Sequence, residues 1–311
     1  MNSNKHAFSR RKFLQSTCAA SLLCTLAPAY TAAMEPGVIR KKIPSSGERL
    51  SVIGLGTSRT FDVDVDNALQ SPLVDVIRVF FDQGGQLIDS SPMYGNAESV
   101  TGALLQKVDN RQDLFTATKV WTNGKEQGIR QMRQSMQRLG VDRIDLMQIH
   151  NLRDWRTHLD TLLDWKAQGK IRYIGITTSH GRYHDELETI LQNQPLDFVQ
   201  FSYNILNRTV ERRLLPLAQE RGIATLINRP YQRGSLFRKV RGKPLPEWAS
   251  EIDCASWGQF FLKFIAAHPA VTCVIPATSK LKHMVDNMAA GFGRLPDESM
   301  RRKMIDYLEA I

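Results

Sequence analysis

The sequence has few cysteines, and none of them forms a cluster with histidines at the spacing of metal ligands. Two of the four cysteines, Cys18 and Cys24, lie in the first 33 residues, which leaves Cys254 and Cys273 in the rest of the chain. A disulfide between these two is compatible with an oxidising compartment, but the simpler expectation is a pair of buried thiols. The sequence therefore predicts no metal centre.

Two kinds of motif are also missing. No arginine-rich run interleaved with aromatic residues is present, so we do not expect nucleic-acid binding. No Gly-x-Gly-x-x-Gly follows the first apolar run at the start of a helical pattern, because Gly54-Leu55-Gly56 supplies only half of that motif. This absence weakens a doubly wound dinucleotide-binding sheet as the fold of the chain.

No apolar run near the N-terminus is long enough to span a membrane comfortably, since residues 18–27 fall short of the roughly 20 residues required. This run follows Ser9-Arg10-Arg11-Lys12-Phe13-Leu14, a twin-arginine pattern, and precedes the small residues Ala27-Pro28-Ala29. We predict that residues 1–33 are a twin-arginine signal peptide and that the translocation machinery of that pathway is a partner. The product is then periplasmic or secreted, with no stable membrane insertion after cleavage.

The charge balance changes when that segment is set aside. The whole chain has a formal net charge of +10 at pH 7, of which Lys5, Arg10, Arg11 and Lys12 contribute four positive charges. The remaining charge of about +6 suits an anionic ligand or a well-solvated surface.

After an expected β-hairpin around Val38–Arg40, short apolar runs alternate with amphipathic stretches. Continuous apolar runs are typical of buried parallel strands, and Gly140, Gly169 and Gly222 stand where helical patterns end. Eight strands alternating with eight helices predict a (β/α)8 TIM barrel with an N-terminal hairpin over residues 34–311, with an open doubly wound sheet as the alternative. The expected strands are 50–54, 86–89, 114–120, 144–150, 173–177, 198–203, 224–228 and 273–276, and the expected helices are 72–83, 98–107, 126–139, 155–168, 184–192, 211–221, 256–267 and 281–290.

Three polar residues, Asp89, Lys119 and His150, each close an apolar run, and Tyr94 follows Asp89 in the same loop. The carboxyl ends of barrel strands are where active sites lie. A phenol with a pKa of about 10 is a poor acid at neutral pH, but a buried cation lowers that pKa and a carboxylate holds the cation in place. Alone, the lysine or the histidine is as easily a structural residue, but together on successive strands they favour a catalytic site.

These motifs, in this order and spacing, resemble the aldo-keto reductase family across residues 38–310. The resemblance implies a nicotinamide cofactor and a catalytic tetrad of Asp89, Tyr94, Lys119 and His150. In the implied mechanism Tyr94 protonates a carbonyl oxygen, Lys119 held by Asp89 lowers the pKa of the phenol, and His150 orients the carbonyl. The motifs that carry the resemblance are Gly54–Thr57, Asp89–Gly95, Lys119–Trp121, Leu139–Leu146 leading to His150, Gly169–Thr177, Phe198–Gln200, and Ile275-Pro276 through Asp286-Asn287.

The resemblance also implies a cofactor site, with NADP(H) as the expected cofactor and NAD(H) as the alternative. Where the family commonly has Ser-Asn this chain has Thr177-Thr178, and at the 2′-phosphate site the usual lysine and arginine become Ala277 and His283, with Lys280 as a substitute cation. The implied cofactor-binding residues are Gly56, Thr57, Thr177, Thr178, Gln200, Arg229, Gln232, Gly234, Thr278, Lys280, His283, Asp286 and Asn287.

One cofactor position departs from the family pattern. The aromatic residue that usually stacks on the nicotinamide aligns with Asn228, and Tyr203 or Tyr231 is the candidate to take its place. The substrate side of the site is expected to include Met93, Trp121 and Asn151. Little sequence follows the last helical pattern, so a long C-terminal loop is missing and an open substrate site is expected.

Two functions are therefore predicted. The first is NAD(P)H-dependent reduction of a small aldehyde or ketone, with Tyr94 as general acid. The alternative is a nicotinamide-binding redox sensor or interaction subunit with little turnover.

Overall fold

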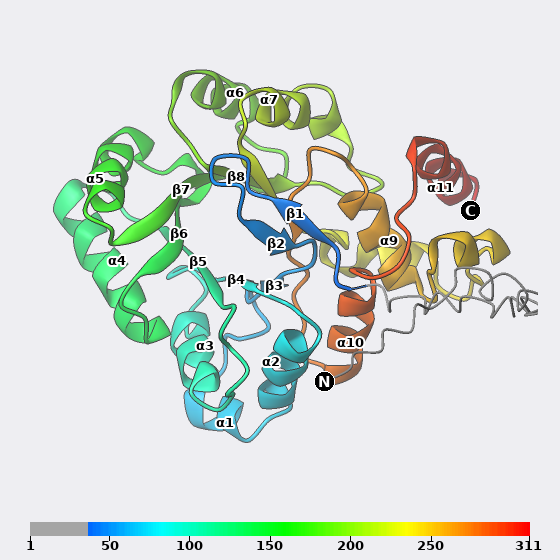
Figure 1. Cartoon of the computed structure of the whole chain (residues 1–311), viewed down its shortest axis with the longest axis horizontal. Coiled ribbons are helices and arrows are strands. Elements are labelled where there is room, and N and C mark those ends of the chain that lie inside the picture. The colour runs from blue at the N-terminus through cyan, green and yellow to red at the C-terminus, as the bar shows by residue number, and fades with distance from the viewer. Residues whose placement is uncertain (1–36) are drawn as a thin grey trace, which may run out of the picture. The chain divides into compact units, whose positions relative to one another are not determined.

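Eight parallel strands form a nearly closed barrel in which each strand pairs with the next one in the chain (Figure 1). The structure is a computed structural model that describes residues 37–311, so the predicted signal peptide, residues 1–33, lies outside the described residues. The predicted (β/α)8 fold is confirmed. The barrel strands are β3 (Leu55–Gly56), β4 (Leu87–Asp89), β5 (Phe115–Val120), β6 (Ile144–Ile149), β7 (Ile171–Thr177), β8 (Phe198–Ser202), β9 (Ala224–Asn228) and β10 (Cys273–Val274).

The barrel closes between β3 and β10 through a few backbone contacts. The N–H of Gly54 donates to the carbonyl of Val274 at 2.8 Å, and the N–H of Gly56 donates to the carbonyl of Pro276 at 3.0 Å. A Cβ atom on Gly56 would lie 2.9 Å from the carbonyl oxygen of Ile275. Glycine is therefore required where the first strand meets the last.

The helices surround the barrel and present apolar faces to it, as the amphipathic patterns predict. All eight predicted helices are present within two or three residues of their expected bounds, and three further helices, α1, α8 and α11, are added. The helices are α1 (Val65–Leu69), α2 (Leu73–Asp82), α3 (Ala97–Leu105), α4 (Lys125–Leu139), α5 (Trp155–Ala167), α6 (His184–Asn193), α7 (Leu214–Glu220), α8 (Ser235–Lys239), α9 (Trp257–Ala266), α10 (Leu281–Ala289) and α11 (Glu298–Ala310), with short 3-10 turns at His150–Leu152, Thr209–Glu211, Gln232–Gly234 and Glu247–Ile252.

The N-terminal hairpin takes residues that the sequence assigned to the first barrel strand. Strand β1 (Arg40–Lys42) pairs antiparallel with β2 (Arg49–Ser51), and strand β3 of the barrel follows at Leu55–Gly56. The predicted barrel strand over 50–54 is therefore only partly correct, because Leu50 and Ser51 lie in the hairpin whereas Ile53 and Gly54 pair with Val274 of β10. A continuous apolar run does not reveal which of two sheets it joins, and here Leu50 belongs to the hairpin.

The hairpin closes the N-terminal end of the barrel. Ile43 and Leu50 are fully buried and pack in one cluster with the inward-facing apolar residues of the strands, including Phe115, Tyr173 and Phe198. Because side chains alternate across a strand, the next inward positions toward the carboxyl ends are two residues further along. The interior is thus apolar at the hairpin end, and polar residues follow above it.

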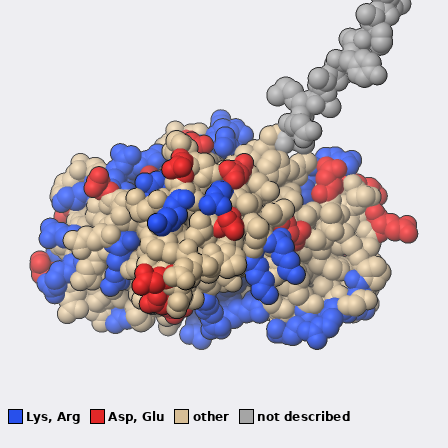
Figure 2. Space-filling view, turned by 90° about the horizontal axis from the view of Figure 1, so that it is seen from below, with Lys and Arg blue, Asp and Glu red and all other residues tan. Residues whose placement is uncertain are grey.

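Charge and cysteine chemistry agree with the sequence analysis. On the face shown in Figure 2, groups of Lys and Arg are interspersed with fewer Asp and Glu groups. Cys254 and Cys273 are both buried and unpaired, so the expectation of free thiols is confirmed. None of the helices within residues 37–311 is long and apolar enough to cross a membrane, and no group of three or more His, Cys, Asp or Glu residues in this range is placed to hold a metal ion.

Candidate active site

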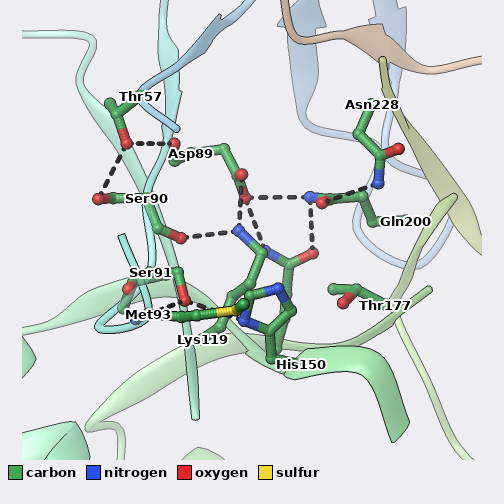
Figure 3. A network of polar contacts seen from close by, with 12 residues as sticks. Thr57, Asp89, Ser90, Ser91, Met93, Lys119, His150, Thr177, Gln200 and Asn228 are labelled. Atoms are coloured by element: carbon green, nitrogen blue, oxygen red, sulfur yellow. Dashed lines mark hydrogen bonds and ion pairs between the residues drawn. The ribbon is translucent and has the colours of Figure 1, made fainter. Parts of the chain in front are cut away.

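A buried ion pair lies at the centre of the barrel mouth (Figure 3). Asp89 ends β4 and Lys119 lies in β5, and the lysine Nζ is 2.6 Å from the Asp89 Oδ2. The two residues are 2% and 0% exposed, and Nζ also donates to the carbonyl of Ser90 at 2.7 Å. Burial alone would lower the pKa of Lys119, but the adjacent Asp89 carboxylate opposes this effect, and the pKa lies above its ordinary value. The lysine is therefore positively charged at neutral pH.

The second oxygen of Asp89 is held by two amides. The Oδ1 atom accepts from Gln148 Nε2 at 2.9 Å and from Gln200 Nε2 at 3.0 Å. Gln148 was missed by the sequence analysis, although it stands two residues before His150 and so faces the same interior. Gly175 makes room for it, because a Cβ there would lie 2.8 Å from Gln148 Cγ.

Tyr94 reaches the pair from the loop after β4. The Lys119 ammonium lies 5.1 Å from the centroid of the Tyr94 ring, which meets the ring of His150 edge-on at 5.7 Å. Burial raises the pKa of the phenol, and the positive charge of Lys119 opposes that rise without cancelling it. The expected lowering of this pKa by Lys119 is present, but burial is the larger effect. The phenol keeps its proton at neutral pH.

His150 follows β6 directly and faces the same space. Its Nδ1 lies 3.0 Å from the hydroxyl oxygen of Ser91, and its ring lies 6.5 Å from the ring of Trp121. Burial, reinforced by the charge of Lys119, lowers the pKa of His150 to about 2. The imidazole is therefore neutral over the whole physiological range. The four predicted catalytic residues are thus brought together at one end of the barrel.

The three residues predicted for the substrate side surround this group. Met93 is 45% exposed, and one face of Trp121 is covered by the guanidinium of Arg153 at 4.9 Å. Asn151 has a left-handed backbone with φ of 53°, and its N–H donates to Thr177 Oγ1 at 3.0 Å. This bond joins the loop after β6 to the end of β7, so Thr177 supports the rim of the mouth.

Asn228 forms a hydrogen-bonded chain at the other side of the mouth. Its Nδ2 donates to the carbonyl of Thr178 at 3.1 Å and to Gln200 Oε1 at 3.3 Å, while its Oδ1 accepts from Ser202 at 2.7 Å. The hydroxyl of Thr178 is buried with no partner among the described residues. A buried hydroxyl without a partner can donate a hydrogen bond to a ligand amide and accept one from it.

The two tyrosines considered as replacements for a stacking ring are placed elsewhere. Tyr203 is fully buried and packs against Phe264, and its hydroxyl is bonded to Glu211 and Arg301. Tyr231 packs against Phe237 of α8 and Phe261 of α9, and its hydroxyl donates to Asn287 Oδ1 at 2.6 Å. Both replacements were therefore wrong, because the two rings fill the layer between strands and helices.

A basic cluster gathers at the strand ends beside Asn228. Burial lowers the pKa of His180, and the charges of the surrounding arginines lower it further; the pKa of Arg229 is lowered in the same way, by burial first. The cluster comprises Arg59, His180, Arg182, Arg229 and Arg233.

Like charges near one another repel, and a bound anion would relieve that repulsion. Within residues 37–311 none of the four arginines of the basic cluster has a carboxylate within 4.0 Å, and Arg229 Nη1 is buried without a partner. Positive φ values at Arg59, His180, Arg229, Gln232 and Arg233 hold these loops in strained conformations. The cluster suits an anionic ligand, and it includes Arg229 and also Arg233, which lies within the Gln232–Gly234 turn. The predicted contact of Arg229, Gln232 and Gly234 with a cofactor stays a prediction. Arg59, His180 and Arg182 were missed, because their distance along the chain from Arg229 gives no sign that they lie near it.

Helix α10 carries the remaining predicted cofactor residues. Lys280 and His283 are exposed at its N-terminal end, where the helix dipole favours an anion, and Thr278 Oγ1 accepts from the Lys280 N–H at 3.1 Å. Asp286 accepts from two side chains of α9, its N-cap Ser256 at 2.8 Å and Gln259 at 2.8 Å. Asn287 accepts from Tyr231, so both of these predicted cofactor residues hold α9 and the loop after β9 in place.

Gly56 and Thr57 are fully engaged within the barrel. Thr57 is 0% exposed, and its hydroxyl donates to the carbonyl of Asp89 at 3.0 Å and lies 3.0 Å from the hydroxyl of Ser90. Together with the close approach of Gly56 to β10, these bonds fix the loop that carries Asp89. Their predicted contact with a cofactor stays a prediction.

A family comparison agrees with this geometry. The model of the Aldo/keto reductase family matches residues 52–306. The chain therefore belongs to the aldo/keto reductase family, and it is an oxidoreductase by that membership.

Similar proteins span much of the chain. NADH-specific methylglyoxal reductase of Escherichia coli is 31% identical over 245 residues, covering 66% of this chain and 72% of that protein. Aldo-keto reductase YhdN of Bacillus subtilis is 29% identical over 217 residues, covering 64% of this chain and 63% of YhdN. A Klebsiella pneumoniae aldo/keto reductase in complex with NADP and acetate has the same fold, with a TM-score of 0.71 at 22% identity, covering 87% of this chain and 96% of that one.

The low pKa of His150 leads to a prediction for the pH dependence of the site. Because burial and Lys119 keep the imidazole neutral, its NMR signals should not titrate between about pH 5 and pH 9, where an ordinary histidine does. Histidine resonances of the full chain, with His150 assigned by its loss in His150→Gln, measure this directly. The exposed His283 serves as an internal comparison. A His150 midpoint near 6.5 would contradict the assigned environment.

Proposed function

We propose that this protein is an NAD(P)H-dependent oxidoreductase that reduces a small aldehyde or ketone, with Tyr94 as general acid. The observation that carries the proposal is the assembly of a protonated phenol, a buried Lys119–Asp89 ion pair and a neutral imidazole around one space. Every member has a chemical task in carbonyl reduction, which favours catalysis over a binding-only sensor.

The chemistry of each residue follows from its surroundings. When bound, a reduced nicotinamide supplies the hydride. Negative charge then develops on the carbonyl oxygen, and Tyr94 donates its proton to that oxygen. The Lys119 ammonium, fixed by Asp89, stabilises the phenolate left behind. His150, neutral and 5.7 Å from the Tyr94 ring, orients the carbonyl beside the phenol.

The residues around the mouth fit a nicotinamide dinucleotide. The orphaned hydroxyl of Thr178 suits the carboxamide, in company with Gln200. The basic cluster at the strand ends suits the pyrophosphate, and the positive N-terminal end of α10 suits a 2′-phosphate. We therefore favour NADP(H). The NADH-specific relative keeps NAD(H) as the alternative, and its name makes methylglyoxal a suitable first substrate for a panel of small carbonyls.

Replacing Tyr94 tests the proposed acid. Tyr94→Phe removes the proton donor and little volume, so we expect cofactor affinity to be retained and the rate of carbonyl reduction to fall by about 10²–10⁴-fold. Fluorescence titration with NADPH and steady-state rates with the carbonyl panel measure the two effects. Undiminished turnover in this variant would refute Tyr94 as the acid. Tight cofactor binding by the wild-type chain without turnover of any carbonyl would instead support the sensor.

Replacing Lys280 tests the cofactor preference. Loss of a cation at the 2′-phosphate should weaken NADPH binding by about tenfold and leave NADH binding unchanged. The matched control is Lys42→Met, which removes an exposed lysine of the same charge from the hairpin at the opposite end of the barrel. Equal losses for both cofactors in Lys280→Met would contradict phosphate recognition at this position.

We further propose that residues 1–33 direct export by the twin-arginine pathway and leave the enzyme periplasmic or secreted. The support is the Ser9–Leu14 pattern followed by a short apolar run and small residues. A reporter that is folded before transport and fused to residues 1–33 should be exported, whereas the same fusion with Arg10→Lys and Arg11→Lys should stay in the cytoplasm. Export that is indifferent to the double substitution would exclude this pathway.

A further inference from the structure

The hydroxyl of Ser91 is the hydrogen-bond partner of the His150 ring at its Nδ1 nitrogen. Ser91 is 0% exposed and His150 is 5% exposed. The Ser91 Oγ lies 3.0 Å from His150 Nδ1 and accepts from the N–H of Met93 at 3.2 Å (Figure 3). The carbonyl of Ser91 accepts from the N–H of Tyr94 at 2.9 Å. One residue thus contacts both the imidazole and the turn that carries the phenol.

The protons of this group can be assigned by counting donors and acceptors. The Met93 N–H is always a donor, so it occupies a lone pair of the Ser91 oxygen. Among residues 37–311, the remaining partner of that oxygen is His150 Nδ1. If Nδ1 carried a proton, the buried serine proton would have no acceptor, which is unfavourable. The serine therefore donates to Nδ1, and the neutral imidazole carries its proton on Nε2.

The Nε2 atom is the one left for a ligand, since within residues 37–311 it makes no hydrogen bond. In the tautomer set by Ser91 this atom is a donor, as a carbonyl oxygen requires. In the other tautomer it would be an acceptor and would repel that oxygen. The orientation of one hydroxyl thus decides whether His150 can help to bind the carbonyl.

We propose that Ser91 is a positioning residue that fixes His150 as the Nε2–H tautomer and thereby makes it a hydrogen-bond donor to the carbonyl oxygen of the substrate. The role of the donor rests on the proposed reduction, whereas the tautomer itself does not. Ser91 also sets the direction of this donor relative to Tyr94, because its backbone and side chain both hold the Ser91–Tyr94 turn.

The tautomer is tested by nitrogen NMR of the full chain labelled with ¹⁵N-histidine. In the wild type the Nδ1 signal of His150 should be that of an unprotonated acceptor and the Nε2 signal that of a protonated donor. Ser91→Ala should give a mixture of tautomers, and Ser91→Thr, which keeps the hydroxyl, should restore the wild-type signals. Ser90→Ala is the control, because the Ser90 hydroxyl contacts Thr57 and not His150. A protonated Nδ1 in the wild type, or an unchanged tautomer in Ser91→Ala, would overturn the proposal.

Kinetics test the consequence for the substrate. Ser91→Ala should lower kcat/KM for carbonyl reduction by about tenfold, the equivalent of one hydrogen bond, with NADPH affinity unchanged and recovery in Ser91→Thr. Loss of NADPH affinity together with kcat/KM would indicate a merely structural role and count against the proposal. If the wild type reduces no carbonyl, the proposed function fails while the NMR result still decides the tautomer.

Discussion

The ion pair between Lys119 and Asp89 is the interaction on which the site depends. Burying two charges is costly unless their remaining donors and acceptors are satisfied. Here the lysine also binds the Ser90 carbonyl, and the carboxylate also binds Gln148 and Gln200. These amides come from β6 and β8, so the pair ties together strands that are far apart in the chain. The polar side chains at the barrel mouth therefore offset the free-energy cost of burying these two charges.

Much of the architecture and the catalytic group could be predicted from the sequence. The fold follows from the alternation of apolar runs and amphipathic stretches, because each parallel strand pairs with its successor. Asp89, Lys119 and His150 could be recognised because each is polar at the end of such a run, and in a barrel all strand ends meet on one rim. For these three residues, the position at the end of an apolar run is enough to predict that they lie at the barrel mouth.

The missed features depend on contacts that no local pattern contains. Leu50 looks like part of a barrel strand, and only its antiparallel pairing with Lys41 assigns it to the hairpin. Gln148 and Ser91 read as ordinary polar residues until the partner across the barrel is known. Asn228 replaces a predicted aromatic position with a chain of hydrogen bonds, and the two nearby tyrosines point into other layers. The order of the strands could be predicted from the sequence, whereas the direction of these side chains could not.

The hairpin at the N-terminal end of the barrel determines how a ligand can reach the site. Because Ile43 and Leu50 close that end with apolar side chains, the polar interior communicates with solvent through the opposite rim alone. A ligand bound over the Lys119–Asp89 ion pair therefore enters and leaves at the carboxyl ends of the strands. If two ligands bind there one above the other, the deeper one must arrive first and leave last. A pair of short strands that contains none of the predicted catalytic residues thus limits access to the site to the carboxyl ends of the barrel strands.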